Sequence, residues 1–236
     1  MNCNTFTHVV ANVLLVAVVI CLMGVMVGWS DVNVFDREDR QSPVYKGQMQ
    51  DAVSLMVNVY WGNEYIDGFL EIFRKYDVKV TFFVGGYWAS RYPDVLAKIY
   101  AGGHEIGNHG YFHKEQGKLD YEKNYSEICT CGKVILDCIG VPTTLFAPPG
   151  GDYNKETLKA ASALNHRTIM WTRDTIDWRD KDSNLVLRRA TQDICGGELI
   201  LMHPTKHTLQ ALENIVKYYQ KNNIKIVTVS RNIGAV

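Results

Sequence analysis

The chain has 236 residues, of which 47% are hydrophobic, enough for one large domain with a substantial core. Its 25 basic side chains balance its 25 acidic ones. This balance, with no basic cluster interleaved with aromatic residues, argues against a nucleic-acid-binding protein. It is compatible with a neutral ligand or a sugar as partner.

The N-terminal segment is the most apolar part of the chain. Residues 1–30 contain no Asp, Glu, Lys or Arg, and residues 9–29 form a nearly unbroken apolar run, long enough to span a bilayer as one helix. A cleaved signal peptide would have a basic start, a shorter apolar core and a small-x-small cleavage site. We therefore expect an N-terminal membrane anchor or uncleaved signal over residues 1–30. Charges after the run give only a weak orientation signal, because Arg37 and Arg40 stand among acidic residues.

The rest of the chain divides into a linker and a domain. Residues 31–50 are polar and charged, which predicts a linker, and residues 51–236 form the predicted domain. Cys129 and Cys131 do not have the spacing of a zinc ribbon or a thioredoxin motif. Free thiols are expected for the cysteines, and a disulfide stays open.

Short β-rich runs alternate with amphipathic helical patterns from residue 52 onward. The predicted strands are residues 53–59, 78–84, 104–107, 144–146, 168–171, 199–203 and 225–229. The predicted helices are residues 66–73, 93–101, 121–139, 155–164, 184–194 and 209–220. This alternation predicts an α/β fold with a parallel sheet and helices outside it. About seven such units suggest a small closed (β/α) barrel, in which function sits where the strands end.

Two histidines four residues apart follow the third predicted strand. His109 and His113 can converge on one divalent metal from a single turn or tight loop, and neutral imidazoles suit zinc or a similar ion. Surface or packing histidines are the alternative. His203 closes the strand 199–203 and predicts either a core histidine or a general acid for a leaving amine. Asp174 and Asp177 are placed to orient it.

These separated strings occur in the order found in a known family. The His109-x-x-x-His113 pair, the string Asp174-Thr175-Ile176-Asp177-Trp178 and the string Leu201-Met202-His203 resemble motifs of the polysaccharide deacetylase family. This family is also called the NodB-homology domain or carbohydrate esterase family four. The resemblance covers about residues 53–230. It implies a deformed (β/α) barrel that removes N-acetyl groups from chitin-like or peptidoglycan sugars with a divalent metal.

The resemblance also implies roles for individual residues. His109 and His113 would bind the metal, most simply zinc, with cobalt as an alternative. His203 would be the acid, and Asp177 the carboxylate that tunes it. The backbone N–H of Gly150 would stabilise the oxyanion. Two further residues belong to the substrate groove by this resemblance: Asp174 and Trp178.

Two motifs depart from the family pattern. The family's first motif, Thr-Phe-Asp-Asp-Gly, reads Asn58-Val59-Tyr60-Trp61-Gly62, so Tyr60 replaces the base aspartate and Trp61 the metal-binding aspartate. Ala147 replaces the arginine that braces the base. Glu64 is the first candidate for a replacement metal ligand, with Asn63 and Asn58 behind it. Tyr60 and Trp61 would either fill core volume or stack on sugar rings.

Two functions follow as expectations. The first is metal-dependent N-deacetylation of a cell-wall or chitin-like polysaccharide, which is hydrolysis of a non-peptide C–N bond, at a rate reduced by the missing base. The alternative is an inactive relative that binds glycan or acts structurally in the envelope or in sporulation, since the first-motif string resembles sporulation-associated bacterial members. In both cases the expected location is a bacterial membrane, single-pass, with the domain on the extracytoplasmic side.

Overall fold

The computed structural model describes residues 13–18 and 41–235. Contacts divide the chain into two units, residues 1–39 and 40–236. Among the described residues no helix is both long enough and apolar enough to cross a membrane. Within the predicted anchor over residues 1–30, the structure describes only residues 13–18, which are helical. The rest of the predicted anchor lies outside the described residues. The anchor therefore stays a prediction.

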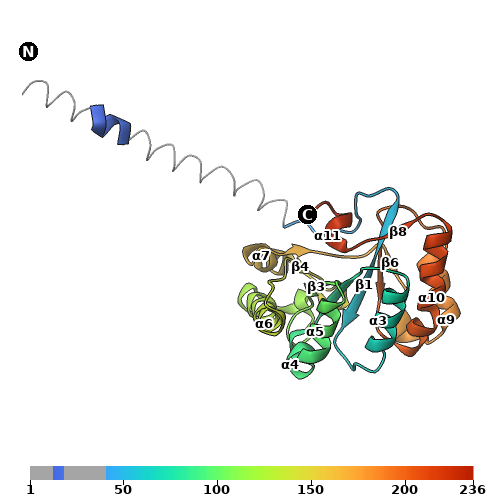
Figure 1. Ribbon diagram of the computed structural model, residues 1–236. Helices are drawn as coiled ribbons and strands as arrows, with labels where there is room; N and C mark the ends of the chain where they lie inside the picture. The colour runs from blue at the N-terminus through green and yellow to red at the C-terminus, as the bar shows by residue number, and fades with distance from the viewer. Residues whose placement is uncertain (1–12, 19–40, 236) are drawn as a thin grey trace, which may run out of the picture. The chain divides into compact units, whose positions relative to one another are not determined.

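A parallel sheet of eight strands forms the centre of the second unit (Figure 1). The strands are β1 (Ala52–Val59), β2 (Thr81–Val84), β3 (Glu105–Asn108), β4 (Leu145–Phe146), β5 (Arg167–Thr168), β6 (Arg173–Asp174), β7 (Leu199–Met202) and β8 (Lys225–Ile226). Their order is β5-β4-β3-β2-β1-β7-β6, and β8 pairs with the start of β1. Every pairing is parallel.

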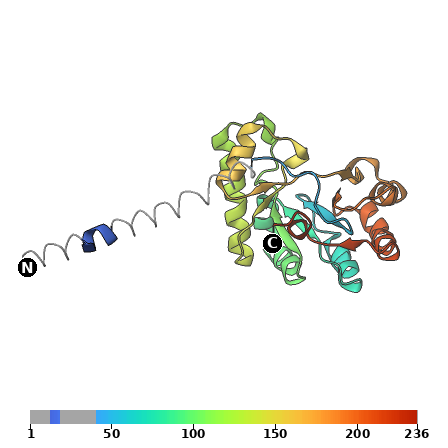
Figure 2. The same ribbon diagram turned by 90° about the horizontal axis from the view of Figure 1, so that it is seen from above.

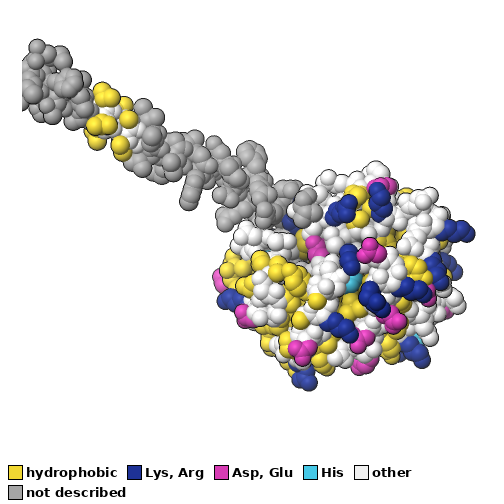
Figure 3. Space-filling view, in the orientation of Figure 1, with side chains coloured by type: hydrophobic (Ala, Val, Ile, Leu, Met, Phe, Trp, Pro, Cys, Tyr) yellow, Lys and Arg dark blue, Asp and Glu magenta, His cyan; other side chains and the backbone are white. Residues whose placement is uncertain are grey.

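Helices cover the outside of the strands (Figures 1 and 2). They are α3 (Ile66–Lys75), α4 (Gly86–Arg91), α5 (Pro93–Ala101), α6 (Tyr121–Ile139), α7 (Lys155–Ala163), α8 (Asp177–Asp180), α9 (Ser183–Thr191), α10 (Lys206–Lys221) and α11 (Val229–Asn232), with short 3-10 turns η1 (Gln116–Lys118) and η2 (Pro149–Gly151). Acidic and basic side chains are interspersed over the face shown in Figure 3, as the zero net charge leads one to expect.

Strand β1 shows how the core has two sides. Alternate residues of a strand point to opposite faces. Val53, Leu55 and Val57 belong to the large cluster shared with the helices. Met56 belongs to a second cluster with Phe83 and other side chains inside the curl of the sheet. Both faces of β1 are buried, which explains its mainly apolar sequence.

The sheet is curled but does not close by hydrogen bonds within the described residues. The predicted α/β fold with a deformed barrel is confirmed in its parallel strands and outer helices, while the predicted closed ring is wrong, because β5 and β6 end the strand order unpaired with each other. Strands β4, β5 and β6 have only two residues each. Pro148 and Pro149 follow β4 closely and lack the N–H groups that a longer ladder needs.

Part of the predicted linker belongs to the folded unit. Val44 forms a parallel bridge with Ile169. The Gly47 N–H donates to the Gly197 carbonyl at 2.6 Å, and the Gln48 N–H donates to Asn232 at 2.7 Å. The domain therefore begins before residue 51. The four described cysteines are free, as expected, although Cys195 is exposed.

Candidate functional site

The predicted site residues lie where neighbouring strands end. Tyr60 follows β1, His109 follows β3, Ala147 follows β4 and His203 follows β7, while Asp177 comes three residues after β6. Since all these strands are parallel, their carboxyl ends lie at one edge of the sheet. The curl of the sheet brings side chains from distant parts of the sequence to one place.

Asn108 starts the loop that carries the two histidines. Its side-chain amide donates to the Ile128 carbonyl at 2.8 Å, and its oxygen accepts from the Gly110 N–H at 2.9 Å. Gly110 has a φ of +71°, a backbone region that favours glycine. The start of the histidine loop is thus tied to Ile128 of helix α6.

Glu127 of α6 holds the rest of this loop. Its buried carboxylate accepts from the backbone N–H groups of Tyr111 at 3.0 Å and Phe112 at 2.8 Å. Lys114 lies 3.1 Å from its other oxygen. His113, between these anchors, has a φ of +55°. Glu127 was missed by sequence reasoning, although a charged residue on the buried stripe of α6 was the available signal.

His109 is buried and held in one orientation. Its Nδ1 lies 2.7 Å from the Ala147 carbonyl oxygen, which can only accept, so Nδ1 carries the proton and Nε2 keeps its lone pair. Burial, with the neighbouring His113 second, lowers the pKa of His109 to about 3. Burial also lowers the pKa of His113. Both imidazoles are therefore neutral at pH 7, the form that binds metals.

Aromatic rings surround His113. The ring centroid of Tyr60 lies 4.7 Å from that of His113, and the centroid of Trp61 lies 4.8 Å from it. The His109 and His113 centroids are 5.1 Å apart. Tyr60 is partly buried, and burial raises the pKa of its hydroxyl. Trp61 is 69% exposed, so it forms a surface wall beside the histidines rather than core.

The donor set does not complete the zinc or cobalt site that the resemblance implies. A catalytic zinc uses three protein ligands drawn from His, Cys, Asp and Glu. In the described part of the chain no group of three such side chains is placed to hold a metal. Glu64, the candidate third ligand, is exposed, and its carboxylate accepts from the Asn63 N–H at 3.1 Å. Asn58 keeps a buried side-chain oxygen that no described residue contacts by a hydrogen bond, but an amide is not among these ligands.

His203 and Asp177 form a tightly bonded pair. Asp177 is buried, and its Oδ1 lies 2.7 Å from Nδ1 of His203. Its Oδ2 accepts from the backbone N–H of His203 at 2.7 Å and from the Thr208 hydroxyl. The His203 side chain is 22% exposed. The Asp177 contact fixes Nδ1, which leaves Nε2 as the ring nitrogen that Asp177 does not engage.

Asp174 has a different partner from the one expected. Its Oδ1 accepts from the Ile176 N–H at 2.8 Å, and Ile176 has a φ of +53°. Asp174 therefore stabilises the turn that brings Asp177 into place and does not orient His203 itself. Thr208, which sequence reasoning missed, supplies the second support of Asp177; no sequence signal marked it.

Gly150 lies in the turn η2 after β4. Its φ is +62°, and open space surrounds the position of a Cβ there. Among the described residues its N–H has no hydrogen-bond partner. The N–H is therefore free to donate, as the predicted oxyanion role requires.

A hollow of about 360 Å³ is lined in part by Asp177, the partner of His203, and we call it the aromatic groove. Its lining comprises Trp61, Gly62, Glu64, Tyr65, Asp177, Trp178, Lys181, Pro204, Thr205, Lys206 and His207. Trp178 is 57% exposed. Exposed tryptophans at a groove are unusual for packing and suit a ligand with flat apolar faces.

The buried histidines predict how stability depends on pH. Burial lowers the pKa of His166 to about 4 and that of His109 to about 3. The unfolded chain binds these protons near pH 6.5 and the folded chain does not, so the free energy of unfolding falls as the pH drops below 6.5. At pH 5 we expect a loss of about 2 kcal/mol for each of the two.

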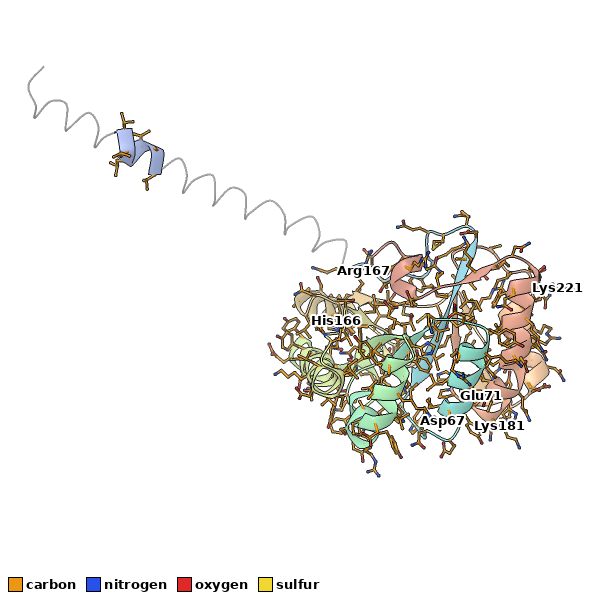
Figure 4. All side chains as sticks on the ribbon, in the orientation of Figure 1. Asp67, Glu71, His166, Arg167, Lys181 and Lys221 are labelled. Carbon is orange, nitrogen blue, oxygen red and sulfur yellow. The ribbon has the colours of Figure 1, made fainter. Side chains whose placement is uncertain are left out.

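Urea unfolding at pH 7 and pH 5 measures this loss. His166→Asn should lower stability at both values and shrink the difference between them. His166 lies in the region of α7 and β5 (Figure 4), so this variant tests the effect apart from the site. Equal stability at both pH values would contradict the prediction.

Comparison with known proteins identifies the relatives of this chain. The family model described as polysaccharide deacetylase matches residues 46–169. The uncharacterized protein YlxY of Bacillus subtilis is 36% identical over 189 residues, which are 80% of this chain and 59% of that protein. A peptidoglycan-N-acetylglucosamine deacetylase of Bacillus cereus is 26% identical over 171 residues, which are 70% of this chain and 62% of that protein. This chain thus spans less than two thirds of the length of these two relatives.

Solved structures agree with this match. A carbohydrate esterase family four pseudoenzyme from Bacillus anthracis superposes with a TM-score of 0.79 at 33% identity, covering 82% of this chain and 69% of that one. A mutant of that pseudoenzyme, described as having restored enzymatic activity, gives 0.79 at 31% identity over 82% and 71% of the two chains. The family match, the motif order and the shared fold agree: this chain belongs to the polysaccharide deacetylase family.

Proposed function

We propose that this chain binds an N-acetylated cell-wall glycan in the aromatic groove and does not hydrolyse it efficiently. The observation that carries this proposal is the packing of Tyr60 and Trp61 around His113, at 4.7 and 4.8 Å. In the family pattern these two positions hold the base and a metal-binding aspartate. Here they hold rings, and one ring forms a groove wall.

The chemistry of the missing groups supports binding without efficient turnover. A general base contributes about 10²–10⁴-fold to a rate. Ala147, at the position of the family's bracing arginine, is buried and carries no charge. The similarity to a Bacillus anthracis pseudoenzyme supports the lack of efficient turnover, and the similarity to a peptidoglycan deacetylase supports a cell-wall glycan as the ligand.

A second candidate is N-deacetylation at a reduced rate. It is favoured by the His203–Asp177 pair, whose bonds are intact at 2.7 Å, and by the free N–H of Gly150. His203 would give a proton from Nε2 to the leaving amine, and Gly150 would donate to the carbonyl oxygen. Tyr60 and Trp61 carry no carboxylate, so neither side chain can act as the general base that takes a proton from water.

We also place the domain outside the membrane, held by the predicted anchor over residues 1–30. Support comes from the apolar run in the sequence and from the peptidoglycan enzymes among the relatives. A role in sporulation is part of the same proposal and is supported by the first-motif string alone.

Single substitutions of the two groove tryptophans test glycan binding. Trp61→Ala and Trp178→Ala should each weaken binding of a soluble N-acetylated glycan oligomer by roughly tenfold, because each removes a stacking face. Tyr100→Ala is the control: Tyr100 is exposed on α5 and is not part of the groove lining. Isothermal titration provides the measurement. Unchanged affinity in both tryptophan variants would contradict glycan binding in the groove.

A further inference from the structure

Two lysines form one wall of the aromatic groove. Lys181 stands between α8 and α9, and Lys206 is the first residue of α10. Both are exposed, and neither forms an ion pair or a side-chain hydrogen bond with another described residue. Nine described lysines form an ion pair with an acidic side chain, whereas Lys181 and Lys206 form none and lie at the same hollow.

The backbone of Lys181 is held in place from both sides. Its φ is +44°, a left-handed conformation that costs a residue with a Cβ about 1 kcal/mol or more. Before it, Asp180 pairs with Arg189 at 2.5 Å; after it, Asp182 caps α9 through the Asn184 N–H at 2.8 Å. In Figure 4 Lys181 lies at the lower edge of the folded unit, below Lys221 at the end of α10.

The other charged groups of the lining leave this wall positive. Asp177 accepts three hydrogen bonds from His203 and Thr208, which satisfy its oxygens. Glu64 has its carboxylate on the Asn63 N–H, in the loop that carries Trp61. The start of α10 adds the positive end of a 16-residue helix beside Lys206. An anion would be attracted to the α8–α10 side and repelled from Glu64.

We propose that the groove selects a glycan unit that carries a carboxylate, with the carboxylate at Lys181 and Lys206 and the sugar ring at the tryptophans. This inference rests on the proposed function. The same hollow of about 360 Å³ offers both the apolar faces of the tryptophans and the two lysine cations. A ligand that uses both therefore carries its anionic group on a sugar ring, as a carboxylated sugar does. A lactyl ether and a uronic acid share this chemistry, and the experiment separates them.

The experiment compares three oligomers of equal length on the full chain. A chitin oligomer is neutral, a peptide-free peptidoglycan strand carries lactyl carboxylates, and an oligomer of alternating N-acetylglucosamine and glucuronic acid carries uronic ones. We expect at least one carboxylated oligomer to bind about tenfold more tightly than chitin at low salt. The preference should shrink at 0.5 M or so of salt, because exposed charges are screened.

Matched charge removals complete the test. Lys181→Asn with Lys206→Gln should abolish the preference and leave chitin binding unchanged; Asn is chosen because it tolerates a left-handed backbone. The control is Lys133→Gln with Lys221→Gln, which removes two unpaired lysines outside the groove and should retain the preference. Equal binding of all three oligomers, with the tryptophan variants still weakened, would overturn this inference alone. Binding of none of them would overturn the proposed function.

Discussion

Replacing Tyr60 and Trp61 with aspartate, and Ala147 with arginine, should raise N-deacetylation by about 10²–10⁴-fold over the unaltered chain. Aspartate at position 60 restores a base, and aspartate at position 61 adds a carboxylate beside His113, whose ring lies 4.8 Å from the present Trp61 ring. His109 and His113 are already neutral, so the new carboxylate completes a three-ligand set of the kind that zinc uses. Acetate release from an N-acetylated glycan, with zinc or cobalt supplied, measures the gain.

The matched control carries asparagine at positions 60 and 61 and arginine at 147. It changes size and polarity in the same way but adds neither a base nor an anionic ligand, so it should gain no activity. Ala147→Arg alone should lower the free energy of unfolding by about 3 kcal/mol, because Ala147 is fully buried and the new charge has no partner. Aspartate at position 60 should recover part of that loss. A folded, metal-loaded triple variant without any gain would contradict the account of the first motif.

Removing the Glu127 carboxylate is expected to destabilise the domain and release the histidine loop. Glu127→Ala leaves the N–H groups of Tyr111 and Phe112 without their acceptor and Lys114 without its partner. Hydrogen bonds to a charged group contribute about 1.5–3 kcal/mol each, so the expected loss is about 3 kcal/mol. Urea unfolding at pH 7 measures it.

Asp137→Ala is the control on the same helix. Asp137 is exposed near the end of α6, so its removal should change the free energy of unfolding by less than about 0.5 kcal/mol. Glu127→Gln keeps one acceptor oxygen and should fall between the two. If Glu127→Ala were as stable as Asp137→Ala, the carboxylate would not hold the loop.

Helix bounds followed from the sequence where end signals were strong. Helix α6 begins and ends as predicted, because Asp120 caps the first turn through the Lys123 N–H and Gly140 takes a φ of +73° after the last. Helix α4 was not predicted, since Gly85 and Gly86 open it and its six residues show no apolar period. The last strand was predicted over residues 225–229, but β8 ends at Ile226 and Val229 begins α11.

The site was predictable to the extent that motif order carries spatial information. His109, His113, Asp177 and His203 all follow predicted strands, and a parallel sheet brings strand ends together. Contacts that depend on loop conformation could not be predicted. Glu64 turns onto its own loop, and Thr208 reaches Asp177 from the next helix, 31 positions along the chain.

The most direct test follows binding and acetate release in one sample. The unaltered full chain is mixed with an N-acetylated peptidoglycan oligomer, bound glycan is measured by titration, and free acetate is measured over the same hours. The account predicts saturable binding with no acetate above a protein-free control. Acetate release at a rate close to that of the triple variant, or no binding at all, would contradict it.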